Sequence, residues 1–222
     1  MRALFTTLRD ENTLHIDFSA AADRLMRILA EEGLAHLPTV ARKAVVTPTG
    51  AVYDGLALPP AQTVAVVSIV RAGDTLMEAV RAIAPGVAVG KILIQRDEES
   101  DGKEPKLFYV KLPADVAERQ VVLVDPMLAT GQSAAMALHE LTRRGVPQES
   151  ITFLNVVSCP EGLAHLRETF PRVRVVTAAI DAGLNSSMYI VPGLGDYGDR
   201  YFGTDAQSLR CRAAGDRDAA PR

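Results

Sequence analysis

The run from Val121 to Ser133 places side chains that can bind a phosphate and a sugar directly after an apolar segment. The apolar residues lead into the carboxylate of Asp125, and a short stretch with Thr130, Gly131 and Ser133 leads into a helical pattern. A loop that feeds a helix N-terminus offers backbone N–H groups and a favourable dipole to a phosphate. The hydroxyls add donors, and the carboxylate can accept hydrogen bonds from two neighbouring sugar hydroxyls. The same residues also fit an ordinary strand–loop–helix connection in which Thr130 or Ser133 caps the helix.

Two arginines are candidates for binding a multiply charged anion. Arg71 follows a second apolar run, Val64 to Val70, and its guanidinium could pair with a pyrophosphate in bidentate fashion. Arg96 opens a charged segment that could close over a bound substrate and exclude water. The alternatives are a surface ion pair for Arg71 and a solvated hairpin for the segment from Asp97 to Lys103.

These side chains need strands and helices to position them, and the chain alternates the two. Short β-branched runs are each followed by a segment with helical periodicity, which predicts a parallel sheet with helices on both faces. Such sheets bind ligands at the carboxyl ends of their strands, so Arg71 and Asp125 are expected in the same crevice. The predicted strands are Val64–Val70, Val121–Val124, Ile151–Val157 and Val173–Ala178, and the predicted helices are Thr75–Ile83, Ser133–Arg144 and Leu163–Phe170.

A helical N-terminus and two irregular segments lie outside this alternation. Apolar residues recur at helical intervals from Phe18 to Leu34, with Asp17 or Ser19 as candidate caps. The charged segment after Gln95 and the glycine-rich segment from 181 to 203 have no period, and such stretches are usually functional in a compact domain. We expect one domain over residues 1–205, with a helical segment at about 1–40, an arm at about 95–110 and a hood at about 181–204, then a disordered tail at 206–222.

Composition and charge argue against several classes of protein. A net charge of -3 gives no sign of the basic surface that nucleic-acid or membrane binding needs. The apolar runs are too short to cross a bilayer, and the first ten residues lack the apolar core of a secretion signal. Cys159 and Cys211 have no metal-type spacing, and the four histidines lie outside the loops named above, so no dedicated metal site is expected. We expect a cytoplasmic protein.

Five segments, in order, resemble the uracil phosphoribosyltransferase family. The most specific is DPMLATG at 125–131, which is similar to the family's phosphoribosyl-pyrophosphate loop, although the family usually has a second glycine where this chain has Gln132. The others look like its N-terminal segment (LRDENT, 8–13), second binding loop (SIVRAG, 68–73), arm (GKILIQRDEE, 90–99) and uracil-binding hood (YIVPGLGDYGDR, 189–200). The resemblance spans about residues 8 to 204. It implies a type I phosphoribosyltransferase-like fold: a parallel sheet with helices on both faces, a flexible arm and a C-terminal hood.

The resemblance implies an enzyme that transfers the 5-phosphoribosyl group from phosphoribosyl pyrophosphate to uracil, giving UMP and pyrophosphate in pyrimidine salvage. It makes Arg71, Arg96 and Asp125 catalytic, and it has uracil read by Ile190, Gly195, Asp196 and Tyr197, largely through backbone groups. The alternative is a regulatory protein of the same fold that binds these ligands without turnover. The implied ligands of phosphoribosyl pyrophosphate are Arg71, Arg96, Asp125, Pro126, Met127, Leu128, Ala129, Thr130, Gly131, Gln132, Ser133 and Asp196.

The implied partners are small molecules and further copies of the chain. Mg²⁺ would arrive as its complex with phosphoribosyl pyrophosphate. The N-terminal and arm segments look like the fungal and protozoan branch of the family, in which GTP activates some members, so the resemblance makes GTP a candidate activator. The family also implies a homodimer or homotetramer, with no nucleic acid and no membrane involved.

Overall fold

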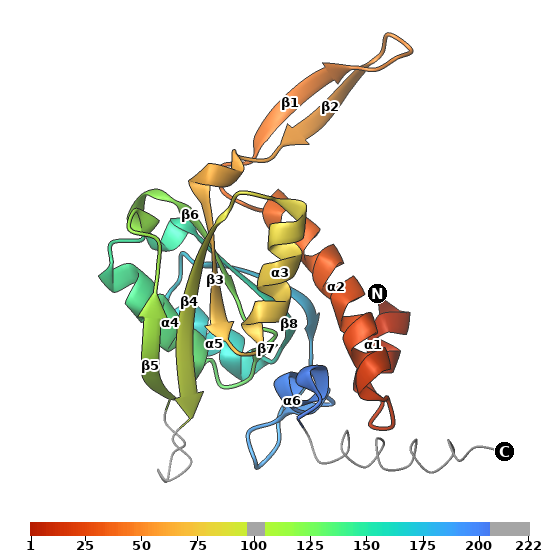
Figure 1. The fold of residues 1–222 in the computed structure, drawn as a ribbon, viewed down its shortest axis with the longest axis vertical. Coiled ribbons are helices and arrows are strands. Elements are labelled where there is room, and N and C mark those ends of the chain that lie inside the picture. Colours follow the sequence, from red (N-terminus) through yellow and green to blue (C-terminus); the bar gives the residue numbers. More distant parts are fainter. Residues whose placement is uncertain (97–104, 205–222) are drawn as a thin grey trace, which may run out of the picture.

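The computed structural model describes residues 1–96 and 105–204, and it places a seven-stranded sheet between two layers of helices (Figure 1). Residues 97–104 of the expected arm and the expected tail at 206–222 lie outside the described residues. The α-helices are α1 (Arg2–Arg9), α2 (His15–Ala35), α3 (Gly73–Ile83), α4 (Gln132–Arg143), α5 (Pro160–Thr169) and α6 (Tyr197–Phe202). The strands are β1 (Ala41–Val46), β2 (Val52–Ala57), β3 (Val64–Val70), β4 (Ala88–Arg96), β5 (Pro105–Lys111), β6 (Gln120–Val124), β7 (Met127–Leu128), β8 (Ile151–Ser158), β9 (Arg174–Ile180), β10 (Gly183–Leu184) and β11 (Ile190–Val191).

The main sheet is parallel except at one edge. Its strands run in the order β5-β4-β3-β6-β8, with the short β7 also paired to β8 and with β9 on the free side of β8. β5 pairs antiparallel with β4, so the parallel sheet expected from the sequence carries one antiparallel strand at its edge. The reason is the length of the connection: eight residues separate β4 from β5, which is too few for the crossover that a parallel pair needs.

The buried strands send alternate side chains into two separate cores. Val66, Val122 and Leu154 pack with α1, α2, α3 and the hood, and their sequence neighbours pack with α4 and α5. This period of two explains why strands covered on both faces are apolar throughout. Helices α2 and α3 cover one face of the sheet and α4 and α5 the other (Figure 1), as the sequence predicts.

The predicted elements are present, with differences at their ends. Helix α2 begins at His15 with Leu14 at its N-cap and no side-chain cap, so the expectation of Asp17 or Ser19 as the cap is wrong. Both residues lie within the helix, which begins three residues before Phe18, the first buried residue of its apolar face. None of the helices in residues 1–96 and 105–204 combines the length and apolar character needed to cross a membrane.

An exposed hairpin formed by β1 and β2 was not predicted from the sequence. Its strands pair from Ala41↔Ala57 to Val46↔Val52, and the turn is closed by Thr47 N–H to Ala51 O at 2.8 Å. Figure 1 shows the hairpin projecting away from the sheet and its helices. No residue of β1 or β2 is buried in the described chain, so the hydrophobic alternation that marks a strand packed on a core does not arise here.

Candidate active site

Arg71 and Asp125 emerge side by side at the carboxyl edge of the sheet. Ser68 in β3 pairs with Val124 in β6, so the residues that follow these two strands leave the sheet at the same edge. Asp125 remains tied to the sheet, because its backbone N–H donates to Leu154 O at 3.2 Å. The topology therefore brings together an arginine and a carboxylate that are far apart in the sequence, as expected for an open α/β sheet.

The segment from Asp125 to Ser133, called here the phosphate loop, leads from β6 into α4. Gly131 has a φ of +82°, a left-handed conformation that residues with a side chain rarely adopt, and it directs the chain into the helix. Gly131 is also the N-cap residue and has no side chain to cap α4, while the hydroxyl of Thr130 accepts the Gln132 N–H at 3.5 Å. The positive end of the α4 dipole and the first-turn N–H groups thus face the phosphate loop, an arrangement suited to a phosphate.

Residues at the start of α5 contact the backbone of the phosphate loop. The Cys159 thiol donates to Ala129 O at 3.0 Å, and the Cys159 backbone N–H donates to Leu128 O at 3.2 Å. Burial raises the pKa of the Cys159 thiol, which keeps it protonated as a donor. Gly162 packs so closely that a Cβ placed on it would lie 2.4 Å from Ala129 O.

Arg71 follows β3 and contacts the C-terminal hood. Its guanidinium donates to Asp199 Oδ1 at 2.7 Å and to Thr204 Oγ1 at 3.2 Å, and it lies over the Phe202 ring at 5.0 Å. Hydrogen bonds from Thr204 and Arg71 hold the pKa of Asp199 below its ordinary value. The Arg71 side chain is still 46% exposed, so part of its surface remains open to a ligand.

The hood, residues 181–204, packs its turns over the same edge of the sheet. β10 and β11 pair antiparallel, and Asp196 caps α6, its Oδ1 accepting the Asp199 N–H at 2.9 Å. Tyr197 is buried and its hydroxyl donates to Thr75 Oγ1 at 3.0 Å, which ties α6 to α3. Burial raises the pKa of the Tyr197 hydroxyl above its ordinary value, so this group stays a hydrogen-bond donor at neutral pH.

A cavity of about 390 Å³ opens between the strand ends and the hood. It contains members of each predicted group: Arg71 and Asp125 from the strand ends, and residues of the phosphate loop and of the hood. A larger cavity of about 520 Å³ lies between α2, α3 and α6, but neither strand-end residue lines it. The smaller cavity is therefore the better candidate site, and its lining consists of Arg71, Ala72, Asp125, Met127, Ala129, Met188, Tyr189, Ile190, Gly195, Asp196, Tyr197 and Gly198.

The remaining predicted site residues are not among those that line this cavity. Pro126 and Leu128 are buried, and Leu128 packs in the core on the α4 side, so only their backbone groups can meet a ligand. Gln132 is exposed at the start of α4, so the departure from the family's glycine adds no buried side chain. Arg96 ends β4, and its side chain is not among the described ones. Thr130, Gly131 and Ser133 continue the phosphate loop beyond the cavity lining.

Four residues that line the cavity were not among the candidate site residues: Ala72, Met188, Tyr189 and Gly198. Ala72, Tyr189 and Gly198 fall inside segments already identified by resemblance, so their neighbours carried a usable signal. Met188 has a φ of +63° in the turn between β10 and β11, and no local pattern marks that turn as facing the site.

The chain matches a family model described as "Uracil phosphoribosyltransferase" over residues 1–204. It is 48% identical over 205 residues to a uracil phosphoribosyltransferase of Dictyostelium discoideum, covering 92% of this chain and 93% of that protein. It is 49% identical over 199 residues to a uracil phosphoribosyltransferase of Saccharomyces cerevisiae, covering 90% of each.

Longer proteins and solved structures are also similar to the chain. Uridine kinase-like protein 3 of Arabidopsis thaliana is 46% identical over 92% of this chain, which spans 43% of that protein. Among solved structures, the AQ2163 protein from Aquifex aeolicus superimposes with a TM-score of 0.76 at 29% identity, covering 92% of this chain and 95% of the other.

Proposed function

This chain belongs to the uracil phosphoribosyltransferase family, and we propose that the cavity between the strand ends and the hood is its active site. The protein is an enzyme that transfers the 5-phosphoribosyl group of phosphoribosyl pyrophosphate to uracil, giving UMP and pyrophosphate in pyrimidine salvage. The observation that carries the site assignment is the convergence of Arg71, Asp125, Ala129 and Asp196 on one cavity of about 390 Å³.

The phosphate loop and the two strand-end residues hold phosphoribosyl pyrophosphate. Thr130, Ser133 and the first-turn N–H groups of α4 bind the 5′-phosphate, which the uncapped helix start supports. Asp125 accepts hydrogen bonds from the ribose hydroxyls. Arg71 and Arg96 neutralise the pyrophosphate, and the exposed guanidinium surface of Arg71 supports its share of that role.

The hood reads uracil with backbone groups of Ile190 and of Gly195 to Tyr197. Uracil presents an acceptor, a donor and an acceptor along O2, N3–H and O4, whereas the matching edge of cytosine presents two acceptors and a donor. Rigid backbone groups that fit the first pattern leave buried partners unsatisfied with the second, at about 1–3 kcal/mol each. The Tyr197 side chain points into the core, which leaves its backbone for recognition.

The reaction needs positioning and charge stabilisation rather than a nucleophilic side chain. Uracil N1 forms a bond to the anomeric carbon as that carbon's bond to pyrophosphate breaks, and the electron pair leaves with the pyrophosphate while the N1 proton is released. The transition state resembles an oxocarbenium ion flanked by a departing anion, so the cationic groups around the leaving group carry most of the stabilisation. Mg²⁺ would come with phosphoribosyl pyrophosphate as its complex and would supply positive charge to the leaving group.

The wider setting follows from the family. We propose that GTP activates the enzyme, that the protein is a homodimer or homotetramer, and that it acts in the cytoplasm. A regulatory protein that binds uracil or phosphoribosyl pyrophosphate without turnover is the less favoured alternative. The reason is that the same cavity is lined by Arg71, which we propose to bind the leaving group, and by residues of the hood.

The decisive experiment measures UMP formation by the purified full chain from labelled uracil and phosphoribosyl pyrophosphate with Mg²⁺. We expect turnover that depends on both substrates and is abolished by omitting either one. Binding of both ligands without any UMP formation would support the regulatory alternative and refute the catalytic assignment.

A further inference from the structure

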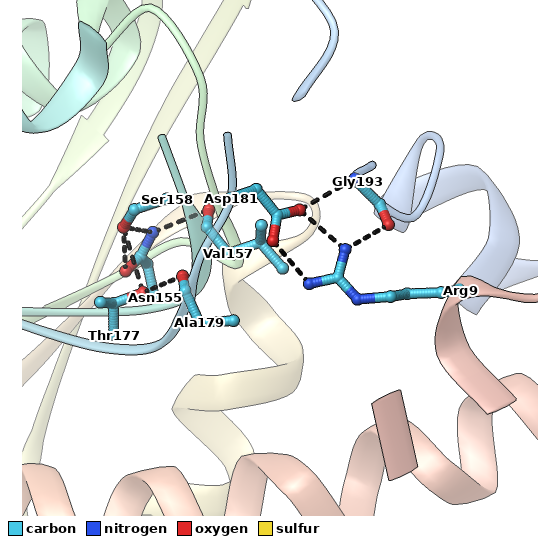
Figure 2. Close-up of polar contacts among 8 residues, drawn as sticks. All are labelled: Arg9, Asn155, Val157, Ser158, Thr177, Ala179, Asp181 and Gly193. Atoms are coloured by element: carbon cyan, nitrogen blue, oxygen red, sulfur yellow. Dashed lines mark hydrogen bonds and ion pairs between the residues drawn. The ribbon is translucent and has the colours of Figure 1, made fainter. Parts of the chain in front are cut away.

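Arg9, the last residue of α1, reaches into the hood although the two are at opposite ends of the chain (Figure 2). Its guanidinium donates to both carboxylate oxygens of Asp181, each at 2.7 Å, and to the backbone carbonyl of Gly193, also at 2.7 Å. Asp181 in turn accepts the backbone N–H of Gly193 at 2.8 Å. Both polar backbone groups of Gly193 are thus held by the same charged pair.

Gly193 lies in the middle of the segment proposed to read uracil. Ile190 and Gly195, which line the cavity, flank it on either side. The turn is tight: Gly193 has a φ of +62°, and a Cβ on it would lie 2.1 Å from Ile190 O. A turn this compact cannot shift at Gly193 without carrying Ile190 and Gly195 with it. Fixing Gly193 therefore fixes the backbone groups on both sides.

Asp181 is itself anchored to the strand that supports the phosphate loop. Its backbone N–H donates to Ser158 O at 2.8 Å at the end of β8, and Ser158 is the partner of Leu128 in β7. The fully buried Asn155 donates its side-chain N–H to Ser158 Oγ at 2.9 Å, and the fully buried Ser158 donates its hydroxyl proton to Thr177 Oγ1 at 3.0 Å (Figure 2). Consecutive hydrogen bonds thus connect the phosphate loop, through β8 and Asp181, to the turn at Gly193.

The ion pair of Arg9 and Asp181 is largely buried. The side chain of Asp181 is 5% exposed and that of Arg9 24% exposed. Burial alone would raise the pKa of Asp181, but hydrogen bonds from Arg9 and from the Gly193 N–H outweigh it and lower the pKa below its ordinary value. Asp181 is therefore ionised at neutral pH, and Arg9 is the cation that makes its burial tolerable.

A second arginine makes the reverse connection. Arg200 of α6 donates to Leu8 O at 2.6 Å and Asp10 O at 2.6 Å, on either side of Arg9, and to Leu194 O at 2.8 Å, next to Gly193. Arg9 of α1 thus binds the hood, and Arg200 of the hood binds the end of α1, in both cases through charge-assisted hydrogen bonds.

We propose that Arg9 and Asp181 are positioning residues for base recognition: they set where the uracil-reading turn lies relative to the bound sugar phosphate. This inference rests on the proposed function of the hood. Neither residue touches the substrate, so the expected consequence of breaking the pair is a loss in uracil binding and in base selectivity, with phosphoribosyl pyrophosphate bound as before.

The test compares Arg9→Ala, Asp181→Asn and Arg9→Lys with the wild-type chain. We expect Arg9→Ala and Asp181→Asn to raise the KM for uracil about tenfold, equivalent to about 1.4 kcal/mol, and to narrow the preference for uracil over cytosine. The affinity for Mg²⁺–phosphoribosyl pyrophosphate, measured by calorimetry without uracil, should change less than twofold. Arg9→Lys keeps the charge but cannot span both carboxylate oxygens and the carbonyl, so it should fall between wild type and Arg9→Ala.

Arg119→Ala is the matched control. Arg119 also binds an aspartate in bidentate fashion, Asp115 at 2.8 and 2.7 Å, and donates to a backbone carbonyl, that of Gln62. It precedes β6, so it lies at the amino edge of the sheet, away from the hood. Its loss should lower stability and leave the KM for uracil unchanged.

Several outcomes would overturn the proposal. An unchanged KM for uracil in Arg9→Ala would do so, as would equal weakening of both substrates or the same kinetic change in Arg119→Ala. If Arg9→Ala does not fold, the milder Arg9→Lys takes its place in the test. The comparison is again between the change in the KM for uracil and the change in the affinity for phosphoribosyl pyrophosphate. Absence of UMP formation by the wild-type chain would instead refute the proposed function, which keeps the two failures distinct.

Discussion

A substitution at Gly162 can displace the phosphate loop while every residue of the loop keeps its identity. It lies in the first turn of α5 in an ordinary helical conformation, so alanine is compatible with its backbone. A Cβ there would lie 2.4 Å from Ala129 O and 2.9 Å from Leu128 O. Because both neighbours are backbone carbonyls, they cannot rotate away as a flexible side chain would, and the loop has to shift.

The size of the effect follows from these distances. Real Cβ contacts essentially never fall below 3.0 Å, so Ala129 O has to move by at least ~0.6 Å in Gly162→Ala. A misplacement of about 1 Å can cost about 10²-fold in rate, so a shift of this size corresponds to a loss on the order of tenfold in kcat/KM for phosphoribosyl pyrophosphate. Replacing a glycine within a helix by alanine also stabilises the folded state, by itself by up to about 1 kcal/mol. Loss of activity without a comparable loss of stability is therefore the expected result.

The assay is steady-state UMP formation with phosphoribosyl pyrophosphate varied at saturating uracil, together with thermal unfolding. Gly33→Ala serves as the control, because its Cβ would meet the flexible Leu154 side chain at 2.5 Å and does not contact the loop. Gly33→Ala should alter the melting temperature and leave kcat/KM unchanged. A value of kcat/KM within twofold of wild type for Gly162→Ala would show that the loop absorbs the shift and would refute the reasoning.

Four further predictions concern other parts of the site. Thr130→Val should raise the KM for phosphoribosyl pyrophosphate far more than that for uracil in steady-state kinetics, since Thr130 is proposed to bind the 5′-phosphate; equal changes would contradict that role. Tyr197→Phe should lower stability by about 1 kcal/mol, or about 2–4 °C in melting temperature, with kinetics unchanged, because the Thr75 hydroxyl it leaves still donates to Ala72 O. Asp181 has a lowered pKa in the folded state, so its contribution is present above about pH 3.8 and is lost as the pH falls further; the stability gap between wild type and Asp181→Asn should narrow below that pH in acid titrations. In competition assays, 5-fluorouracil should be accepted and cytosine rejected by about two orders of magnitude or more, because two unpaired buried groups cost roughly 3 kcal/mol.

Local sequence was sufficient to predict the parallel core and the phosphate loop. The runs that became β3, β6 and β8 are apolar because both faces are covered, and neighbouring residues in the sequence show this property. The loop from Asp125 to Ser133 was identified by the strand before it, the helix after it and Gly131 between them. Such patterns extend over about ten residues or fewer, which is the range in which periodicity and turn chemistry act.

Contacts between distant parts of the chain could be decided only by the tertiary structure. Nothing near Arg9 in the sequence indicates that it meets Asp181 and Gly193, and nothing near Arg71 points to Asp199 as its partner. The antiparallel β5 and the exposed β1–β2 hairpin also escaped prediction, because edge and projecting strands lack the buried alternation that marks a core strand. Side-chain type and spacing specify what a residue can bind, whereas the partner it meets depends on how separate elements pack, and that is settled only when the whole chain has folded.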